Sequence, residues 1–237
     1  MVAGLNEAVA RNGRWGFWLC YQWLRNQGYP WNHKRCWRVY CQMRLHLPRR
    51  TKRRLPPVVR QPLHAPSGAN QIWALDFMQD AVWSGRAFRI LTVIDESTRE
   101  VLAIEIDTSL PSGRVIRVLE HLRGERGLPT VLRIDNGPEL RSQAFGDWCA
   151  AHGIALRFIQ PGKPHQNAFI ERFNRTYRYE VLDAYVFDSL QHVRLISEGW
   201  MRLYNEERPH RALDRLPPMR FAERLASPAI SSYPVSP

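Results

Sequence analysis

The sequence lacks the marks of a membrane-spanning or secreted protein. No apolar run approaches the roughly 20 residues that a transmembrane helix needs, and the first thirty residues do not follow a signal-peptide pattern. Cysteine is scarce: Cys20, Cys36, Cys41 and Cys149 are scattered along the chain and suggest no disulfide framework. We therefore expect a soluble protein of a reducing intracellular compartment, without a membrane partner.

Acidic side chains are nearly absent from the first third of the chain. Residues 1–70 contain 13 Lys and Arg but only one acid, Glu7, whereas residues 71–237 contain 21 of each sign. The whole net charge of +12 therefore lies in the first third. This asymmetry favours a nucleic-acid-binding arm attached to a neutral domain, although a basic solvated tail would have the same composition.

Residues 1–47 are predicted to form a small helical region. Apolar residues at helical spacing predict a helix over residues 14–27, with Gly28 at its end. Asn32 is suited to begin a second helix that runs to about residue 45. Two short helices joined by a tight turn form a helix-turn-helix-like unit, which serves either DNA binding or simple packing. We expect DNA binding here.

Two further features of this region have competing interpretations. Five tryptophans crowd residues 15–37, and we interpret them as core packing rather than as a partner surface. Two histidines and two cysteines invite a zinc interpretation: His33, Cys36, Cys41 and His46. Their spacing lacks the paired two-residue gaps of zinc sites, and one helix would scatter the four side chains, so we do not predict zinc.

A proline-rich basic segment follows at residues 48–70. Its cations form the run Arg49, Arg50, Lys52, Arg53 and Arg54. We interpret this segment as an extended linker that lies along a DNA phosphate backbone.

The remaining sequence has the pattern of an α/β domain, expected to span residues 71–226 and to be followed by a disordered tail at 227–237. The predicted strands cover residues 72–78, 88–95, 101–106, 131–135 and 154–159, and the predicted helices cover 112–124, 140–152, 165–184 and 188–206. The first three strands are linked by short turns, which favours antiparallel pairing between them. The last two strands alternate with helices, as in an α/β domain.

Two aspartates lie where strands of this domain could bring them together. Asp76 falls inside the first predicted strand, where a buried charge is costly unless it is paired or binds a metal. Asp135 follows a later strand, and the carboxyl ends of strands are where α/β sheets bind ligands. Each has a plainer interpretation: a salt bridge for Asp76, and a simple Asp-Asn-Gly turn for Asp135.

A third acid, Glu171, lies beside the buried stripe of its predicted helix. At roughly 100° per residue it stands about 110° from the centre of that stripe, and Arg178 lies on the same side of the helix. An acid at the edge of the core with a nearby cation suits a metal and a phosphate, although a surface ion pair is commoner.

The strings around these acids carry a specific resemblance. LDF around Asp76, DNGPEL at 135–140, PGKPHQNAFIERFNRTYR at 161–178 and YNEERPHRAL at 204–213 resemble the retroviral-integrase-like DDE transposases, and 35 residues separate Asp135 from Glu171. The resemblance runs from about residue 14 to about residue 225. Within these transposases the chain looks like the catalytic, second-reading-frame subunit of a bacterial insertion sequence.

The resemblance implies a fold, a triad and partners. The fold would be ribonuclease-H-like, an α/β domain whose mixed five-stranded sheet is flanked by helices, with a small helical N-terminal domain. Asp76, Asp135 and Glu171 would form the DDE triad and hold two Mg²⁺ ions, with Mn²⁺ as an alternative, since both prefer oxygen ligands. The chain would act in the bacterial cytoplasm, on the nucleoid, as a homo-oligomer on insertion-sequence ends and target DNA. It would do so together with the upstream-frame subunit, because the separate sequence-reading region of that frame is absent here.

The resemblance also suggests DNA contacts near the third acid. The expected contacts are Lys163, His165, Gln166 and Asn167 before the Glu171 helix, and Arg172, Arg175 and Arg178 on it. Glu139 is expected at a helix start, where it interacts with the helix dipole or supports the metal site. YNEERPH at 204–210 is interpreted as support for the fold, with Pro209 ending a helix.

Two other functions compete with the transposase interpretation. A general nuclease of the same fold would share the three acids, but ERFN, YNEERPH and the 35-residue spacing weigh against it. A DNA-binding regulator or inactive relic would occupy element ends without cutting. The presence of all three acids argues against a relic without removing the regulator interpretation.

Overall fold

A five-stranded mixed sheet forms the centre of the molecule. The computed structural model describes residues 1–48, 66–160 and 164–227. The strands are β1 (Ile72–Ala81), β2 (Ala87–Asp95), β3 (Val101–Asp107), β4 (Val131–Ile134) and β5 (Ala155–Phe158). Their order in the sheet is β3-β2-β1-β4-β5. The first three strands pair antiparallel, and β4 and β5 are parallel to β1. The predicted sheet is confirmed, each strand within three residues of its expected ends.

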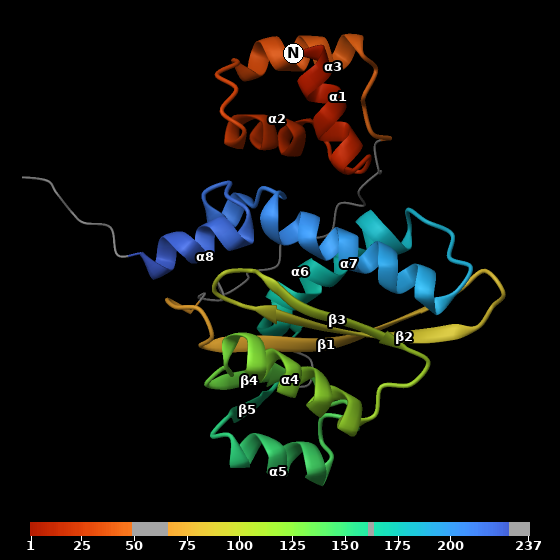
Figure 1. Cartoon of the computed structure of the whole chain (residues 1–237), viewed down its shortest axis with the longest axis vertical. Helices are drawn as coiled ribbons and strands as arrows, with labels where there is room; N and C mark the ends of the chain where they lie inside the picture. The colour runs from red at the N-terminus through yellow and green to blue at the C-terminus, as the bar shows by residue number, and fades with distance from the viewer. Residues whose placement is uncertain (49–65, 161–163, 228–237) are drawn as a thin grey trace, which may run out of the picture.

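Helices cover both faces of the sheet and give three layers (Figure 1). They are α4 (Ser112–Arg126), α5 (Gln143–Ala151), α6 (Ala168–Tyr177), α7 (Leu190–Glu206) and α8 (Pro218–Ala226). Strand alternation separates two cores. Ala74, Ile90 and Ile106 face α6 and α7, whereas Trp73, Leu75 and Leu91 face α4 and α5. The expected ribonuclease-H-like class is confirmed by this architecture.

The predicted helix over residues 165–184 is divided into three consecutive helical segments of different geometry. A short 3-10 turn, η1 (Pro164–Asn167), precedes α6, and a π-helical turn, η2 (Arg178–Leu182), follows it. The predicted apolar stripe is correct, since Ile170, Phe173, Tyr177 and Val181 are all buried. The prediction missed the division because the wider last turn is tied to a tertiary contact of the buried Glu180.

Three short helices form a separate core at the N-terminus: α1 (Val2–Arg11), α2 (Phe17–Asn26) and α3 (His33–Gln42). The expected end of α2 is confirmed, since Gly28 takes a φ of +88° and Tyr29 N–H donates to the carbonyl of Leu24 at 3.1 Å, closing a Schellman motif. Asn32 caps α3 as predicted, its side chain accepting from Lys34 N–H at 2.8 Å. The prediction missed α1 and α8.

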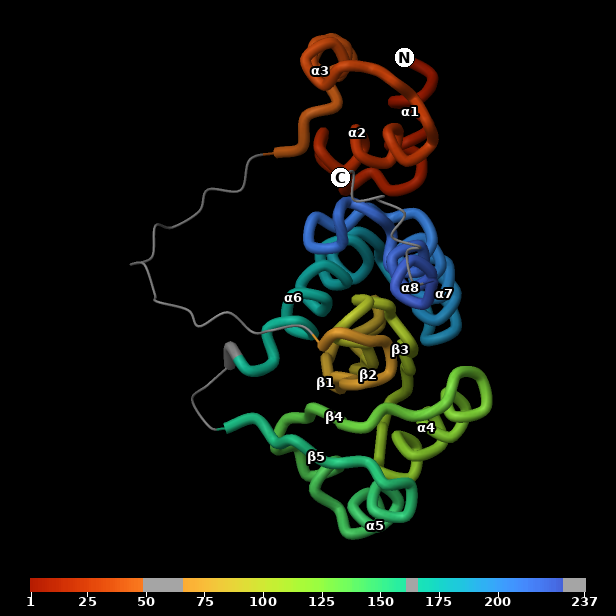
Figure 2. The backbone as a smooth tube through the Cα atoms, turned by 90° about the vertical axis from the view of Figure 1, so that its left-hand side faces the viewer, coloured from red at the N-terminus to blue at the C-terminus, as the bar shows by residue number. Residues whose placement is uncertain are grey.

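This helical region lies on the α7 side of the molecule, away from α4 and α5 (Figure 2). Trp23 Nε1 donates to Glu207 at 3.0 Å, and Arg11 approaches the same carboxylate at 3.3 Å. Arg14 donates to the carbonyl of Asp183 at 2.8 Å, and Asn26 to that of Arg215 at 3.0 Å. These contacts connect the N-terminal helices to the segment that contains YNEERPH.

The packing interpretation of the five tryptophans is correct for only part of them. Trp15 and Trp23 are buried and Trp31 is half-buried, but Trp18 and Trp37 are exposed. The predicted basic run at 49–54 and nearly all of the predicted tail lie outside the described residues. Within the described residues, no helix has the length and apolarity to cross a bilayer.

Candidate active site

Strand register brings Asp76, in the middle of β1, beside Asp135, which follows the last residue of β4. Ala74 of β1 pairs with Arg133 of β4. Continuing that parallel register by two residues sets Asp76 opposite Asp135, on strands that lie about 4.8 Å apart. Alternation places both side chains on the face of Ala74, which α6 and α7 cover. The side chains of Asp76 and Asp135 therefore lie on the same face of the sheet, on neighbouring strands.

Helix α6 carries Glu171 to this face. Asn174, one turn further along α6, donates from Nδ2 to Oδ2 of Asp76 at 2.7 Å. Glu171 precedes Asn174 by three residues and so projects from the same side of the helix. Glu171 is half-buried beside the buried stripe, as the helical-wheel argument predicted.

The carboxyl group of Asp76 lies in an environment that opposes its ionisation. Burial raises the pKa of Asp76 to about 6, and the nearby charges of Asp135 and Glu171 act in the same direction. Hydrogen bonds from Phe77 N–H, at 2.9 Å, and from Asn174 act against this rise in pKa. Asp76 thus feels the negative charge of both other acids, and a bound cation would relieve this repulsion.

A fourth acid stands next to Asp135. A Cβ atom on Gly137 would lie 3.0 Å from Oδ1 of Asp135 and 3.3 Å from Oε2 of Glu139, so a larger residue there would press against both carboxylates. Gly137 N–H also donates to Oδ1 of Asp135 at 2.9 Å. The Arg89 guanidinium pairs with Glu139 and lowers the pKa of that carboxyl group below its usual range.

The expected position of Glu139 at a helix start is wrong. Helix α5 begins only at Gln143, because the Ser142 side chain accepts from Phe145 N–H at 3.3 Å and caps the helix there. Glu139 lies in the preceding turn, where its partner is Arg89 of β2 instead of a helix dipole.

Buried charges hold the segment that enters α6. Arg133 donates from Nη1 to the carbonyl of Gln166 at 2.6 Å, and its Nε lies 2.9 Å from Oε1 of Glu96. Glu96 is fully buried, and burial raises its pKa to about 7 although Arg133 and Arg99 act to lower it. The Arg99 guanidinium lies 3.4 Å from the ring centre of Phe169 at the start of α6.

Sequence reasoning missed these supporting residues for different reasons. Asn174 could have been found, since it lies one helical turn from Glu171. Glu96 lies in the turn after β2 and Arg133 lies in β4, and only the sheet order reveals that they meet.

The predicted DNA contacts have varied surroundings. Arg172 and Arg175 are exposed on α6. Arg178 instead pairs with Asp80 at 2.9 Å and donates to the carbonyl of Gln79 at 2.8 Å. Gln166 accepts from Gln160 N–H at 2.9 Å, and Asn167 is buried. Lys163 lies outside the described residues, as does the side chain of His165.

The donor set of the site suits a hard divalent cation. Carboxylates from the middle of β1, from the end of β4 and from α6 offer oxygen atoms, the ligands that Mg²⁺ prefers. Within the described part of the chain, no three His, Cys, Asp or Glu side chains are gathered closely enough to hold one ion as they stand. The electrostatic coupling of Asp76 to both other acids is the observation that makes the three a candidate ligand set.

Comparison with known proteins identifies the catalytic domain. Two models of an integrase core domain match residues 66–164 and 152–218. A protein of insertion element IS407 from Burkholderia multivorans is 38% identical over 224 residues, which is 94% of this chain and 81% of that protein. A protein of insertion element IS476 from Xanthomonas euvesicatoria is 39% identical over 222 residues, covering 94% of this chain and 64% of its own length.

Solved structures agree on the fold. A chain of the simian T-cell lymphotropic virus intasome, in complex with a PP2A regulatory subunit, superposes with a TM-score of 0.59 at 17% identity, covering 88% of this chain and 72% of its own. The HTLV-2 integrase catalytic core in complex with magnesium gives a TM-score of 0.51 at 17% identity, covering 65% of this chain and 97% of its own. The integrase core and the insertion-element relatives together show that this chain belongs to the insertion-sequence transposases with an integrase-like catalytic core.

Proposed function

We propose that the chain cleaves DNA at the ends of an insertion sequence and joins them to target DNA, with Asp76, Asp135 and Glu171 as metal-binding DDE triad. The carrying observation is the environment of Asp76 on the face of β1 that α6 covers: burial raises its pKa to about 6, and the charges of Asp135 and Glu171 act in the same direction. Isolated carboxylates that only form surface ion pairs do not create such an environment.

The reaction consists of two phosphodiester displacements. Water attacks a phosphorus atom at the element end, releasing a 3′-hydroxyl and leaving a 5′-phosphate. That 3′-hydroxyl then attacks a target phosphodiester, forming the new joint and expelling a target 3′-hydroxyl. No covalent intermediate with the protein is involved.

The residues of the chain hold and orient the site. Asp76, Asp135 and Glu171 would hold Mg²⁺, two ions being the expected number. Bound Mg²⁺ supplies the charge that activates an attacking oxygen and stabilises a leaving one. Asn174 orients the Asp76 carboxylate through its 2.7 Å hydrogen bond, and Arg133 fixes the backbone at Gln166 from which α6 begins. The exposed Arg172 and Arg175 are suited to DNA phosphates.

Cleavage and joining of a labelled element-end duplex test this function. Wild-type protein is incubated with the duplex and a target plasmid in Mg²⁺ or in EDTA, with and without the upstream-frame subunit. The proposal expects cut and joined products in Mg²⁺ and none in EDTA. Binding without any product, even with the upstream subunit added, would instead favour the regulator that occupies element ends.

Asn174→Leu is expected to lower cleavage about tenfold at pH 7, since a hydrogen bond to a charged group contributes about 1.5–3 kcal/mol. Loss of the Nδ2–H donor raises the pKa of Asp76 further. The acidic limb of the pH–rate profile should therefore move to higher pH, and activity should partly return at pH 8.5.

Thr92→Val removes the donor to Oδ1 of Asn174, at 2.9 Å, and should cause a smaller change in the same direction. An equal loss of rate at every pH would contradict this role.

A further inference from the structure

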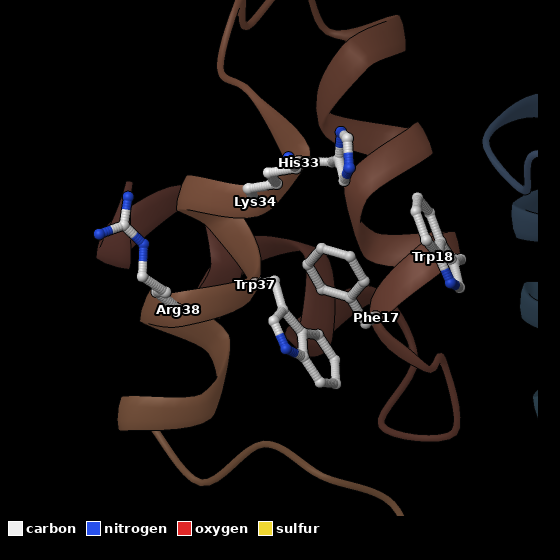
Figure 3. A pocket seen from close by; sticks show the side chains of 6 residues that line it. All are labelled: Phe17, Trp18, His33, Lys34, Trp37 and Arg38. Carbon is white, nitrogen blue, oxygen red and sulfur yellow. The ribbon is translucent and has the colours of Figure 1, made fainter.

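Two exposed indole rings border a hollow on the N-terminal helices. Trp18 on α2 is 62% exposed and Trp37 on α3 is 45% exposed. The hollow has a volume of about 510 Å³ and is lined by Phe17, Trp18, His33, Lys34, Trp37 and Arg38. Figure 3 shows the rings of Phe17 and Trp37 close together, with Lys34 and Arg38 along α3 and Trp18 on the other side.

A second hollow adjoins the first across Trp18. It has a volume of about 360 Å³ and is lined by Trp18, Leu19, Gln22, Pro209, Arg211 and Arg215. Its wall therefore comes partly from α2 and partly from residues 209–215 of the catalytic domain. Because both hollows have Trp18 in their walls, they lie side by side between α3 and the catalytic domain, and the two together are called the track below.

The charges along this track have one sign. Lys34, Arg38, Arg211 and Arg215 line it, and no Asp or Glu does. Within residues 1–48, 66–160 and 164–227, none of these four cations is in an ion pair, and the adjacent Asp214 pairs with Arg224. Unneutralised cations beside apolar rings fit a polyanion that also presents flat apolar faces.

We propose that this track binds unpaired nucleotides of DNA, with bases stacked on Trp18 and Trp37 and phosphates at the four cations. Paired bases in a duplex already stack on each other, so their faces are not available to an exposed indole, whereas the bases of a single strand are. An apolar helix of a protein partner would gain nothing from four uncompensated cations. The proposal deepens the proposed function, because it assigns a site for the unpaired DNA that accompanies cutting and joining.

Binding of labelled oligonucleotides to the full chain tests this site. The probes are an oligothymidylate of about 16 nucleotides, the same strand with abasic sites, and a duplex of equal length, measured by fluorescence anisotropy. Trp18→Ala is expected to weaken binding of the thymidylate strand about tenfold, the loss expected for one stacked base. Trp18→Phe should restore most of it, and the abasic strand should bind wild type weakly.

The matched control is Trp83→Ala, since Trp83 is 80% exposed in the β1–β2 turn and lines neither hollow. This variant should bind the thymidylate strand like wild type. The proposal is overturned if Trp18→Ala and Trp83→Ala bind alike, or if the abasic strand binds as tightly as the thymidylate strand. It is also overturned if Trp18→Ala loses only self-association, measured by sedimentation, because the track would then be a protein interface.

The two proposals can fail separately. Absence of Mg²⁺-dependent cleavage of the element-end duplex by wild type would refute the transposase chemistry and leave the oligonucleotide comparison valid. Active wild type whose Trp18→Ala variant keeps full single-strand affinity would refute only the track.

Discussion

Asp76→Asn is expected to abolish cleavage and joining while making the metal-free protein more stable. The loss of activity should reach about 10³-fold or more, because a metal ion contributes several kcal/mol to charge stabilisation in the transition state. The gain in stability follows from the environment of the wild-type side chain. Folding buries Asp76 beside Asp135 and Glu171 and raises its pKa from 3.8 to about 6. An asparagine has no charge to bury.

The direction of the pH dependence follows from this raised pKa. The folded protein binds the Asp76 proton more tightly than the unfolded chain does. The contribution of Asp76 to the free energy of unfolding is therefore greatest at low pH and falls as pH rises from about 4 to about 6. The shift corresponds to a loss of at most about 3 kcal/mol in the free energy of unfolding at neutral pH. Asp76→Asn avoids that loss, less the cost of a poorer hydrogen bond with Phe77 N–H or Asn174.

Urea unfolding in EDTA at pH 4, 6 and 8 measures this difference. The gap between Asp76→Asn and wild type should widen with pH, and addition of Mg²⁺ should stabilise wild type more than the variant. Asp80→Asn is a suitable control for stability, because Asp80 lies on the same strand but has a surface pair with Arg178, worth about 0–1 kcal/mol. A variant that unfolds like wild type at pH 8, or that still cuts DNA, would contradict the assigned role of Asp76.

The strands were predictable because they depend on local pattern, whereas local pattern only marked the three acids as candidates and the family resemblance joined them into a triad. Alternating apolar residues define β1 to β3, and Asp76 and Asp135 occupy positions where charge is costly or ligands gather. The apolar stripe of α6 located Glu171 beside the core without any knowledge of its partners. Short stretches of sequence therefore sufficed for the strands, and the structure confirms the sheet.

The missed features depend on packing between distant segments. Helix α1 has small apolar residues, and it packs closely against the rest of the N-terminal region. A Cβ atom on Gly4 would lie 3.0 Å from Leu24 and 3.3 Å from Trp31. Glu96 and Arg133 come together only through the order of the sheet. For α8 a local signal did exist, since Pro218 stands in its first turn, where proline favours a helix start.

Arg208→Met is expected to lower the free energy of unfolding more than other substitutions away from the carboxylate triad, because Arg208 pairs with a buried acid that is distant in the sequence. Arg208 donates to Oε1 of Glu180 from Nε at 3.1 Å and from Nη2 at 2.8 Å. Glu180 lies in η2 and is 3% exposed, and its other partner is Nε1 of Trp200 at 3.0 Å. Removing the guanidinium leaves a buried carboxylate without a counter-charge, which costs about 3–5 kcal/mol and lowers Tm by roughly 10 °C.

A double variant separates loss of the ion pair from loss of packing. Glu180→Gln combined with Arg208→Met should recover most of the lost stability, because a neutral amide can still accept from Trp200 without carrying a buried charge. Arg224→Met serves as the control, since its pair with Asp214 is exposed and should change stability by less than about 1 kcal/mol. If Arg208→Met melts within 2 °C of this control, the ion pair does not support the fold. Arg133 would hold helix α6 at its start, and Arg208 would hold the chain just beyond its end. In the Arg208→Met variant the contact with Glu180 is lost, so cleavage should fall more at 37 °C than at 20 °C.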